Sequence, residues 1–171
     1  MRCLLLYPLN ALVNDQVERI SEYLAAADKD GLGLRLFHFT SETPEMYNDK
    51  NREVLLYPDH RVQTRQEARG LEGRYRGSNK PDKFDSDDPR RPQAPDIVVT
   101  NYSMLSYMLC RPQDDWFFGP ALRSIVLDEA HLYTGTLAAE ITLLLRRVLL
   151  RCERTPEQVL QLATSATLGG D

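Results

Sequence analysis

The sequence predicts an α/β fold in which a parallel sheet is flanked by helices. Three observations lead to this fold class. Short apolar runs typical of buried strands alternate along the chain with longer segments of helical spacing. The runs are continuous rather than alternating, as expected for strands that are covered on both faces. Polar or turn-forming residues follow each run, which is typical of strand ends that form a ligand-binding edge.

The first part of the chain predicts a strand, a long helix and a second strand. Residues 3–7 (CLLLY) are a continuous apolar run that Pro8 ends. Residues 11–29 then change to helical spacing, with Gly31 where a helix would stop. The apolar face of this helix consists of Val13, Val17, Ile20, Leu24 and Ala27. Residues 34–39 (LRLFHF) predict the second strand.

The last part of the chain repeats this alternation. Residues 97–100 (IVVT) predict a strand, and a short helix follows it. The apolar side of that helix consists of Met104, Leu105, Met108 and Leu109. Residues 124–127 (SIVL) predict another strand, residues 136–152 an amphipathic helix that Pro156 breaks, and residues 159–163 (VLQLA) a final strand. Strands that alternate with helices imply βαβ units and therefore parallel pairing.

The composition is that of one folded domain rather than of a disordered or membrane protein. Of its 171 residues, 42% are hydrophobic and 27% are charged, which allows a sizeable core. The net charge of −4 gives no bulk argument for nucleic-acid binding, so such contact would need a local patch. Cys3, Cys110 and Cys152 form no CxxC pair and indicate a reduced, cytoplasmic protein without structural zinc. No apolar stretch is long enough to predict a signal peptide or a membrane span.

Residues 57–95 interrupt the alternation of strands and helices. They are polar, charged and rich in proline and glycine, and a compact domain rarely contains so long a structureless loop. We expect a partly disordered insertion that lies outside the sheet. Arg61, Arg65 and Arg69 recur every fourth residue, which would place them on one face of a helix. Two interpretations stay open: a solvated surface loop, or a basic helix that contacts a polyanion.

Polar segments follow the predicted strands at the edge where parallel α/β sheets bind ligands. These segments are YPLNAL (7–12), FTSETP (39–44), TNYSML (100–105), DEAH (128–131) and TSAT (164–167). Asp128, Glu129 and His131 are the strongest candidates for chemistry, because three ionisable groups directly follow a buried strand. The residues that we expect at one edge of the sheet are Pro8, Thr43, Thr100, Asp128 and Ser165.

These segments, in this order, resemble the motifs of superfamily two DEAD/DEAH-box helicases. LDEAH resembles motif II, the Walker B box, and SAT at 165–167 resembles motif III. YPLNALVNDQ (7–16) resembles motif Ia, VVTNYSML (98–105) resembles motif Ib, and FTSETP resembles a loop that in many relatives reads Thr-Gly-Asp-Thr-Pro. The segment DEAHLYTGTLAAEITLLLRR looks most similar to large DNA-repair and phage-defence helicases. The resemblance implies a RecA-like (P-loop NTPase) domain, the first of such a helicase.

The resemblance implies ATP and Mg²⁺ as cofactors, and the chemistry of the residues agrees with it. ATP hydrolysis needs a divalent cation on the phosphates and a polarised attacking water. Asp128, at a strand end, can hold the hydrated Mg²⁺, and its neighbour Glu129 can accept a proton from the water. By resemblance, His131 contacts motif III or the second domain and relays the state of the nucleotide. The coupling residues of motif III are Ser165, Ala166 and Thr167, whose two hydroxyls have local turn hydrogen bonds as their alternative role.

Motifs Ia and Ib imply a path for a nucleic-acid strand, with DNA favoured over RNA. Backbone N–H groups at helix N-termini and small hydroxyls suit phosphates and read no sequence. The candidate residues are Pro8, Asn10, Ala11, Thr43, Thr100, Asn101 and Met104. Two positions depart from the family pattern. Asn10 stands where relatives often carry a basic or hydroxyl residue, and Ser41-Glu42 stands where Gly-Asp is usual.

The phosphate-loop signature GxxxxGK[ST] does not occur in the sequence. In the family this loop precedes motif Ia, and a second RecA-like domain with arginine fingers follows motif III. We therefore expect residues 1–171 to be a partial helicase ATP-binding domain, from motif Ia to motif III, of a parent protein that is an ATP-dependent helicase. The phosphate-loop strand would pair beside the strand that ends at Ala163. The isolated chain is therefore expected to be marginally stable and catalytically inactive.

Two other functions stay open at this point. The first is a non-catalytic, ATPase-derived domain that serves as a binding or scaffold module, although such a module has no use for Glu129. The second is a metal-dependent hydrolase that uses Asp128, Glu129 and His131. Such an enzyme would have too few ligands, because the other histidines, His38 and His60, lie in unrelated segments.

Overall fold

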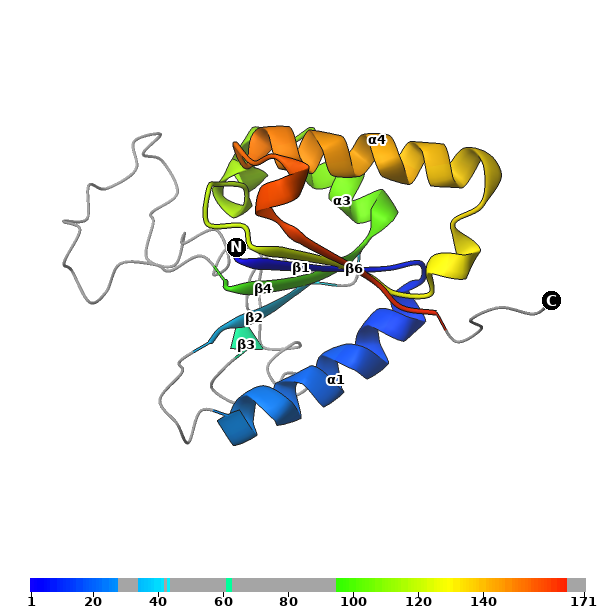
Figure 1. Ribbon diagram of the computed structural model, residues 1–171. Coiled ribbons are helices and arrows are strands. Elements are labelled where there is room, and N and C mark those ends of the chain that lie inside the picture. The colour runs from blue at the N-terminus through cyan, green and yellow to red at the C-terminus, as the bar shows by residue number, and fades with distance from the viewer. Residues whose placement is uncertain (28–33, 42, 44–60, 63–94, 166–171) are drawn as a thin grey trace, which may run out of the picture.

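The fold is a parallel sheet with helices on both faces. The computed structural model describes residues 1–27, 34–41, 43, 61–62 and 95–165 (Figure 1). Helix α1 covers one face of the sheet, and helices α3 and α4 cover the other (Figure 1). The strand pairings in the described part of the chain are all parallel. The predicted α/β class is therefore confirmed.

The described sheet has six strands in the order β3-β2-β4-β1-β5-β6. The strands are β1 (Cys3–Tyr7), β2 (Leu36–Phe39), β3 (Arg61–Val62), β4 (Ile97–Asn101), β5 (Ser124–Leu127) and β6 (Leu160–Ala163). The helices are α1 (Asn10–Ala27), α3 (Tyr102–Met108) and α4 (Gly135–Arg151), with the 3₁₀ turns η2 (Pro112–Phe117), η3 (Ala130–Leu132) and η4 (Pro156–Gln158). Each strand that the sequence predicts is present, with bounds close to those predicted.

The strand β3 was not predicted from the sequence. It pairs with the edge of β2 through Arg61 and Val62, so the prediction that residues 57–95 lie outside the sheet is wrong at these two positions. The physical reason is that the open edge of β2 presents backbone groups with which even a short segment can pair. Because Arg61 lies in a strand, the predicted helical face of three arginines is wrong at its first member. Arg65, Arg69 and the rest of the segment, up to residue 94, lie outside the described residues.

Alternate residues of the strands build a separate apolar core on each face of the sheet. The larger core, under α3 and α4, includes Leu4, Leu6, Phe37, Phe39, Val98, Leu105, Met108, Phe117, Ile125 and Val148. The smaller core, under α1, contains Tyr7, Val13, Val17, Leu36 and Val99. Neighbouring strand residues thus point into opposite cores, and this double coverage explains the continuous apolar runs in the sequence.

The strand β6 lies at an edge of the described sheet, and its side chains are poorly covered. It pairs with β5 from Ser124 opposite Leu160 to Leu127 opposite Ala163. All four of its residues are exposed, and Leu160 retains 59% of its accessible surface. Despite this exposure, β6 positions the residues that follow it beside the end of β5.

The three cysteines, Cys3, Cys110 and Cys152, are all free thiols. Among the described helices, none combines the length and the apolar character that crossing a membrane requires.

Candidate functional site

The carboxyl ends of the strands meet at one edge of the sheet. The register places Tyr7 opposite Asn101, and it places Leu127 opposite both Leu6 and Ala163. The residues that follow these positions therefore lie along the same edge, which confirms the predicted arrangement of the strand ends. The edge has two parts, an acidic loop after β5 and a polar groove at the ends of β1, β2 and β4.

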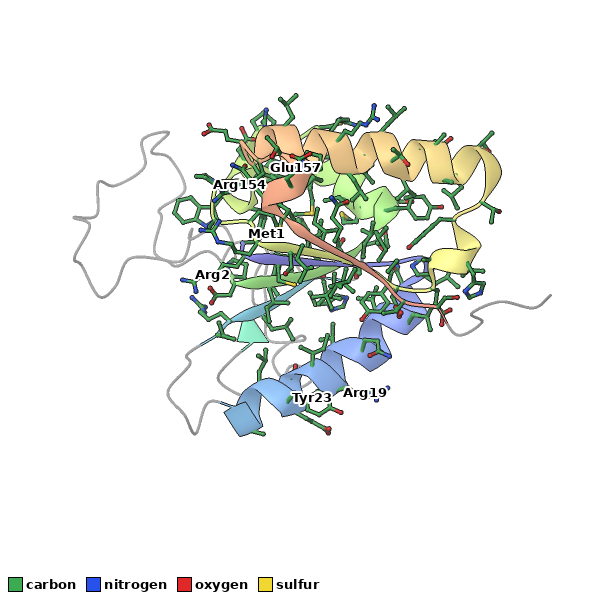
Figure 2. The ribbon with its side chains drawn as sticks, in the orientation of Figure 1. Met1, Arg2, Arg19, Tyr23, Arg154 and Glu157 are labelled. Atoms are coloured by element: carbon green, nitrogen blue, oxygen red, sulfur yellow. The ribbon has the colours of Figure 1, made fainter. Side chains whose placement is uncertain are left out.

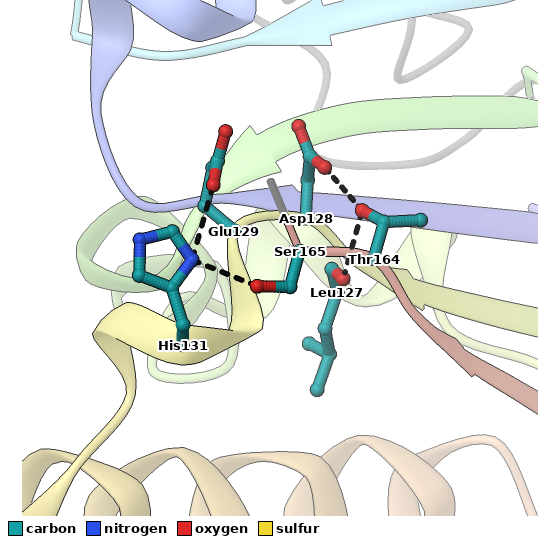
Figure 3. Close-up of polar contacts among 6 residues, drawn as sticks. All are labelled: Leu127, Asp128, Glu129, His131, Thr164 and Ser165. Atoms are coloured by element: carbon teal, nitrogen blue, oxygen red, sulfur yellow. Dashed lines mark hydrogen bonds and ion pairs between the residues drawn. The ribbon is translucent and has the colours of Figure 1, made fainter. Parts of the chain in front are cut away.

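Asp128 is the first residue after β5, and neighbouring strands fix its position on both sides. Its backbone N–H donates to the carbonyl of Leu6 in β1 at 2.9 Å. Its carboxylate oxygen Oδ1 accepts a hydrogen bond from the hydroxyl of Thr164, which follows β6 (Figure 3). No described residue donates a hydrogen bond to the other oxygen, Oδ2, so this oxygen is left for a cation or a water.

Glu129 turns the chain out of the direction of the strand. Its φ of 50° and ψ of 44° lie in the left-handed region, which residues other than glycine rarely occupy. The N–H of Ala130 donates to the carbonyl of Thr164 at 2.8 Å, and the N–H of Leu132 donates to the carbonyl of Glu129 at 2.9 Å. These bonds hold the turn. The carboxylate of Asp128 therefore faces Thr164, whereas the carboxylate of Glu129 faces His131 (Figure 3).

His131 connects the acidic loop to the segment after β6. Its Nδ1 lies 3.2 Å from Glu129 Oε2 and 3.0 Å from Ser165 Oγ (Figure 3). The contact with Ser165 Oγ is a hydrogen bond, whereas the contact with Glu129 Oε2 is a close approach without hydrogen-bond geometry. The structure brings these three residues together as the relay hypothesis requires, and the relay itself stays a prediction. Ala166 and Thr167 lie outside the described residues.

Thr164 is a residue of this site that the sequence reasoning missed. Its N–H donates to the carbonyl of Leu127 at 2.8 Å, its carbonyl accepts from Ala130, and its hydroxyl donates to Asp128. These three bonds fasten the acidic loop to the end of β6. The signal in the sequence was its place directly before Ser165, but the contact follows from the pairing of β5 with β6, which spacing does not reveal.

Two tyrosines in the surroundings of Asp128 remain neutral at ordinary pH. Burial, and secondly the Asp128 carboxylate, raises the pKa of Tyr7 to about 12 and that of Tyr133 to about 12. The Tyr133 hydroxyl is buried and has no hydrogen-bond partner in the described part of the chain. Neither ring therefore adds charge near Asp128.

The second part of the edge is a groove of about 570 Å³ at the ends of β1, β2 and β4. The side-chain amide nitrogen of Asn101 donates to Asn10 Oδ1 at 2.5 Å, and that of Asn10 donates to Ser41 Oγ at 3.2 Å. Asn101 Oδ1 accepts from the backbone N–H of Met104 at 2.8 Å and so caps α3. This chain of hydrogen bonds fixes three strand ends relative to one another.

The other residues predicted to contact a nucleic-acid strand occupy different environments. Pro8 lines the groove. The hydroxyl of Thr43 donates to the carbonyl of His38 at 2.8 Å, and that of the fully buried Thr100 donates to the carbonyl of Phe39 at 2.5 Å. These two hydroxyls hold the loop after β2, while the side chain of Ala11 lies outside the described residues. Direct contact between these residues and a phosphate stays a prediction.

The side chains around Asp128 suit Mg²⁺, which takes few protein ligands, better than a metal ion whose ligands all come from the protein. In the described part of the chain, no group of three or more His, Cys, Asp and Glu side chains could hold a metal ion. His131 Nδ1 faces Glu129 and Ser165, which gives no support to the metal-dependent hydrolase. Mg²⁺ usually takes one or two carboxylates and completes its shell with water and phosphate oxygens, so a single carboxylate such as Asp128 is sufficient.

The fold is an open parallel α/β sheet, and an acidic loop at one strand end is hydrogen-bonded to the end of the neighbouring strand. Proteins of this class bind their ligands at the carboxyl ends of the strands. The DEAD/DEAH box helicase family matches residues 61–171, well over half of the chain, and the chain belongs to this family. The recognition that rested on motifs Ia, Ib, II and III is therefore confirmed.

Individual relatives add detail to this assignment. The Druantia protein DruE of Escherichia coli (strain UMEA 4076-1) is 39% identical over 87 residues, which are 45% of this chain and 5% of DruE. The crystal structure of the DUF1998 helicase MrfA bound to DNA and AMPPNP superposes with a TM-score of 0.58 at 23% identity, over 99% of this chain and 18% of that one. MrfA bound to DNA alone gives a TM-score of 0.59 at 22% identity, again over 18% of its chain. The likeness to MrfA shows the fold, and this chain spans a small part of each relative.

Proposed function

We propose that this chain is part of the ATPase core of a DNA helicase or translocase. This proposal rests on the hydrogen bonds at the end of β5. Through them, Thr164 and Ser165 hold the loop of residues 128–131 against the end of β6. A solvated loop would need no such bonds between two strand ends, and the alternative scaffold module would have no use for the strained turn at Glu129.

Each carboxylate has a separate role in the proposed reaction. Asp128 holds Mg²⁺ through its free oxygen Oδ2, while Thr164 fixes Oδ1. Bound Mg²⁺ would neutralise charge on the phosphates of ATP. Glu129 accepts a proton from the attacking water as the general base. His131, paired with Glu129 and Ser165, transmits the state of this site to the rest of the helicase.

The groove at the other part of the edge is the proposed path of the nucleic-acid strand. The polar residues of its lining, Asn10, Ser41 and Asn101, suit a sugar–phosphate backbone, which is bound without reading of sequence. DNA is favoured over RNA because the motifs resemble those of DNA helicases and because MrfA has been crystallised with DNA. The acidic loop and the groove share the edge, so nucleotide turnover and strand movement can be coupled.

Further parts of the full-length protein complete the proposed site. We propose that a phosphate-loop strand pairs with the exposed edge of β6 and that a second RecA-like domain supplies arginine fingers. The first proposal rests on the family pattern and on the exposure of Leu160 and Leu162 along β6, and the second rests on the family pattern alone. A cytoplasmic location is proposed from the three free thiols.

The test of the proposed function is ATP hydrolysis by the full-length protein with and without single-stranded DNA. We expect hydrolysis that requires Mg²⁺ and that DNA stimulates, with a stimulation that falls as salt rises because phosphate contacts are screened. DNA binding without any hydrolysis would support the scaffold module. Hydrolysis that DNA leaves unchanged would contradict the proposed path of the strand.

Replacing Thr164 tests how the metal carboxylate is positioned. We expect Thr164→Val, which keeps the shape but removes the hydroxyl, to raise the Mg²⁺ concentration for half-maximal hydrolysis about 10-fold or more, as loss of a hydrogen bond to a metal ligand typically does. Thr164→Ser keeps the hydroxyl and should behave as the unchanged protein. Equal effects of valine and serine would show that packing, and not the bond to Asp128, is what matters.

A further inference from the structure

Tyr107, near the end of α3, is a large aromatic side chain that the fold does not need for its core. It exposes 62% of its surface, while its neighbours Leu105 and Met108 are fully buried. The ring lines the groove described above, together with Leu9, which exposes 60%. Exposed aromatic and aliphatic groups that line one groove are typical of a binding surface.

Arg111 supports one side of this ring. Its guanidinium carbon lies 5.5 Å from the centroid of the Tyr107 ring, within the range of a cation–π contact. Arg111 is itself held from below, because its Nε lies 3.7 Å from a carboxylate oxygen of the fully buried Asp114. When the Gln113 amide is turned with its oxygen toward Arg111, this oxygen accepts from Nη2 at 2.6 Å and from Nε at 2.9 Å. The tyrosine and arginine therefore form a preorganised platform rather than two mobile side chains.

We propose that Tyr107, backed by Arg111, stacks against a nucleobase of the strand that runs through the groove. The inference rests on the proposed function, since it assigns one base contact to the path along which Asn10, Ser41 and Asn101 bind the backbone. Aromatic rings are the usual platform for bases in single strands, and a neighbouring arginine adds attraction for the linked phosphate. A volume of about 570 Å³ is large enough for one nucleotide unit.

A nucleobase fits this surface better than an apolar peptide segment does. The lining of the groove includes polar groups, with the side-chain amides of Asn10 and Asn101 linked to each other. Its apolar lining comes from Pro8, Leu9 and Met104 and from the rings of Tyr102 and Tyr107. A flat aromatic surface beside polar groups and a cation matches a base attached to a sugar phosphate. Stacking is also tolerant of sequence, which suits a translocating protein.

The experiment compares two labelled single strands that share a sugar–phosphate backbone, one with normal bases and one abasic. Fluorescence anisotropy gives the Kd of each strand for the full-length protein. We expect Tyr107→Ala to weaken binding of the normal strand roughly tenfold and to leave binding of the abasic strand unchanged. Tyr107→Phe and Tyr107→Trp keep an aromatic ring and should keep the affinity, whereas Tyr107→Leu should resemble alanine.

Tyr23→Ala is the matched control. Tyr23 exposes 68% of its surface but lies on α1, away from the groove and on the other face of the sheet (Figure 2). This variant should bind both strands as the unchanged protein does. If Tyr107→Ala weakens both strands equally, or neither, the stacking proposal is overturned while the proposed function stands. If the unchanged protein binds neither strand, the proposed function itself fails, and the platform fails with it.

Discussion

Glu129→Gln in the full-length protein is expected to lower the rate of ATP hydrolysis roughly 10²–10⁴-fold, the range that a positioned general base contributes. Glutamine keeps the size and polarity of the side chain but cannot accept a proton from water. Because Asp128 and its bond to Thr164 are unchanged, the affinity for ATP with Mg²⁺ should remain. Steady-state hydrolysis and binding of a fluorescent ATP analogue measure the two quantities separately.

The contact with His131 gives this prediction a second readout. The carboxylate of Glu129 lies 3.2 Å from His131 Nδ1, and a neutral amide would remove the negative charge that faces the imidazole ring. We therefore expect Glu129→Gln to reduce the stimulation of any remaining hydrolysis by DNA. Glu22→Gln, at an exposed position of α1, is the control and should change neither rate. Undiminished turnover by Glu129→Gln would mean that the water is activated by another residue.

Much of the sheet and of the acidic loop could be predicted because both depend on local patterns. The run Ile125–Leu127 followed by Asp128 and Glu129 marks a strand and its polar end, and the structure has both, although only Ile125 of this strand is buried. Pairing between strands was harder to predict, since backbone ladders form wherever an edge is open. The two residues of β3 lie in a charged segment whose composition gives no sign of a strand.

The contacts that complete the site join residues far apart in the chain. Asn10 and Asn101 are hydrogen-bonded across 91 positions, and Thr164 reaches Asp128 across 36. Each member was visible in the sequence only as a polar residue at a strand end. Their pairing depends on the strand order β4-β1-β5-β6, which spacing along the chain does not encode. Tyr107 was missed for a different reason, because it lies outside the predicted apolar face of its helix and a single exposed tyrosine belongs to no motif.

Phe117 is a core residue rather than a site residue. Among the substitutions proposed for this chain, its replacement should lower the free energy of unfolding the most. Phe117 is fully buried in η2 and lies parallel to Phe37, with ring centroids 5.6 Å apart and an interplanar angle of 2°. Its ring is also 5.7 Å from that of Phe39. The segment at 112–117 was not predicted to be ordered structure, yet its aromatic ring closes the larger core over β2.

Phe117→Ala is expected to lower the free energy of unfolding by about 3–5 kcal/mol, because it removes a buried ring and leaves a cavity beside two others. Urea unfolding of the protein, followed by circular dichroism, measures the loss. Trp116→Ala is the control: the neighbouring ring is 41% exposed, so its removal should cost much less. Similar losses of unfolding free energy for the two variants would show that the packing of Phe117 against Phe37 and Phe39 contributes little to stability.

Phe117 lies far from the acidic loop, so its replacement should change stability without changing the binding of ATP or DNA. Its carbonyl accepts from the backbone nitrogen of Met1 at 3.1 Å, which places it beside the start of β1. Asp128 bonds to Leu6 near the opposite end of the same strand. The Phe117→Ala protein that remains folded should therefore bind ATP and DNA with unchanged affinity, in contrast to the variants of Thr164 and Tyr107. Loss of either affinity at a temperature where the variant is folded would show that the core and the site are coupled through β1.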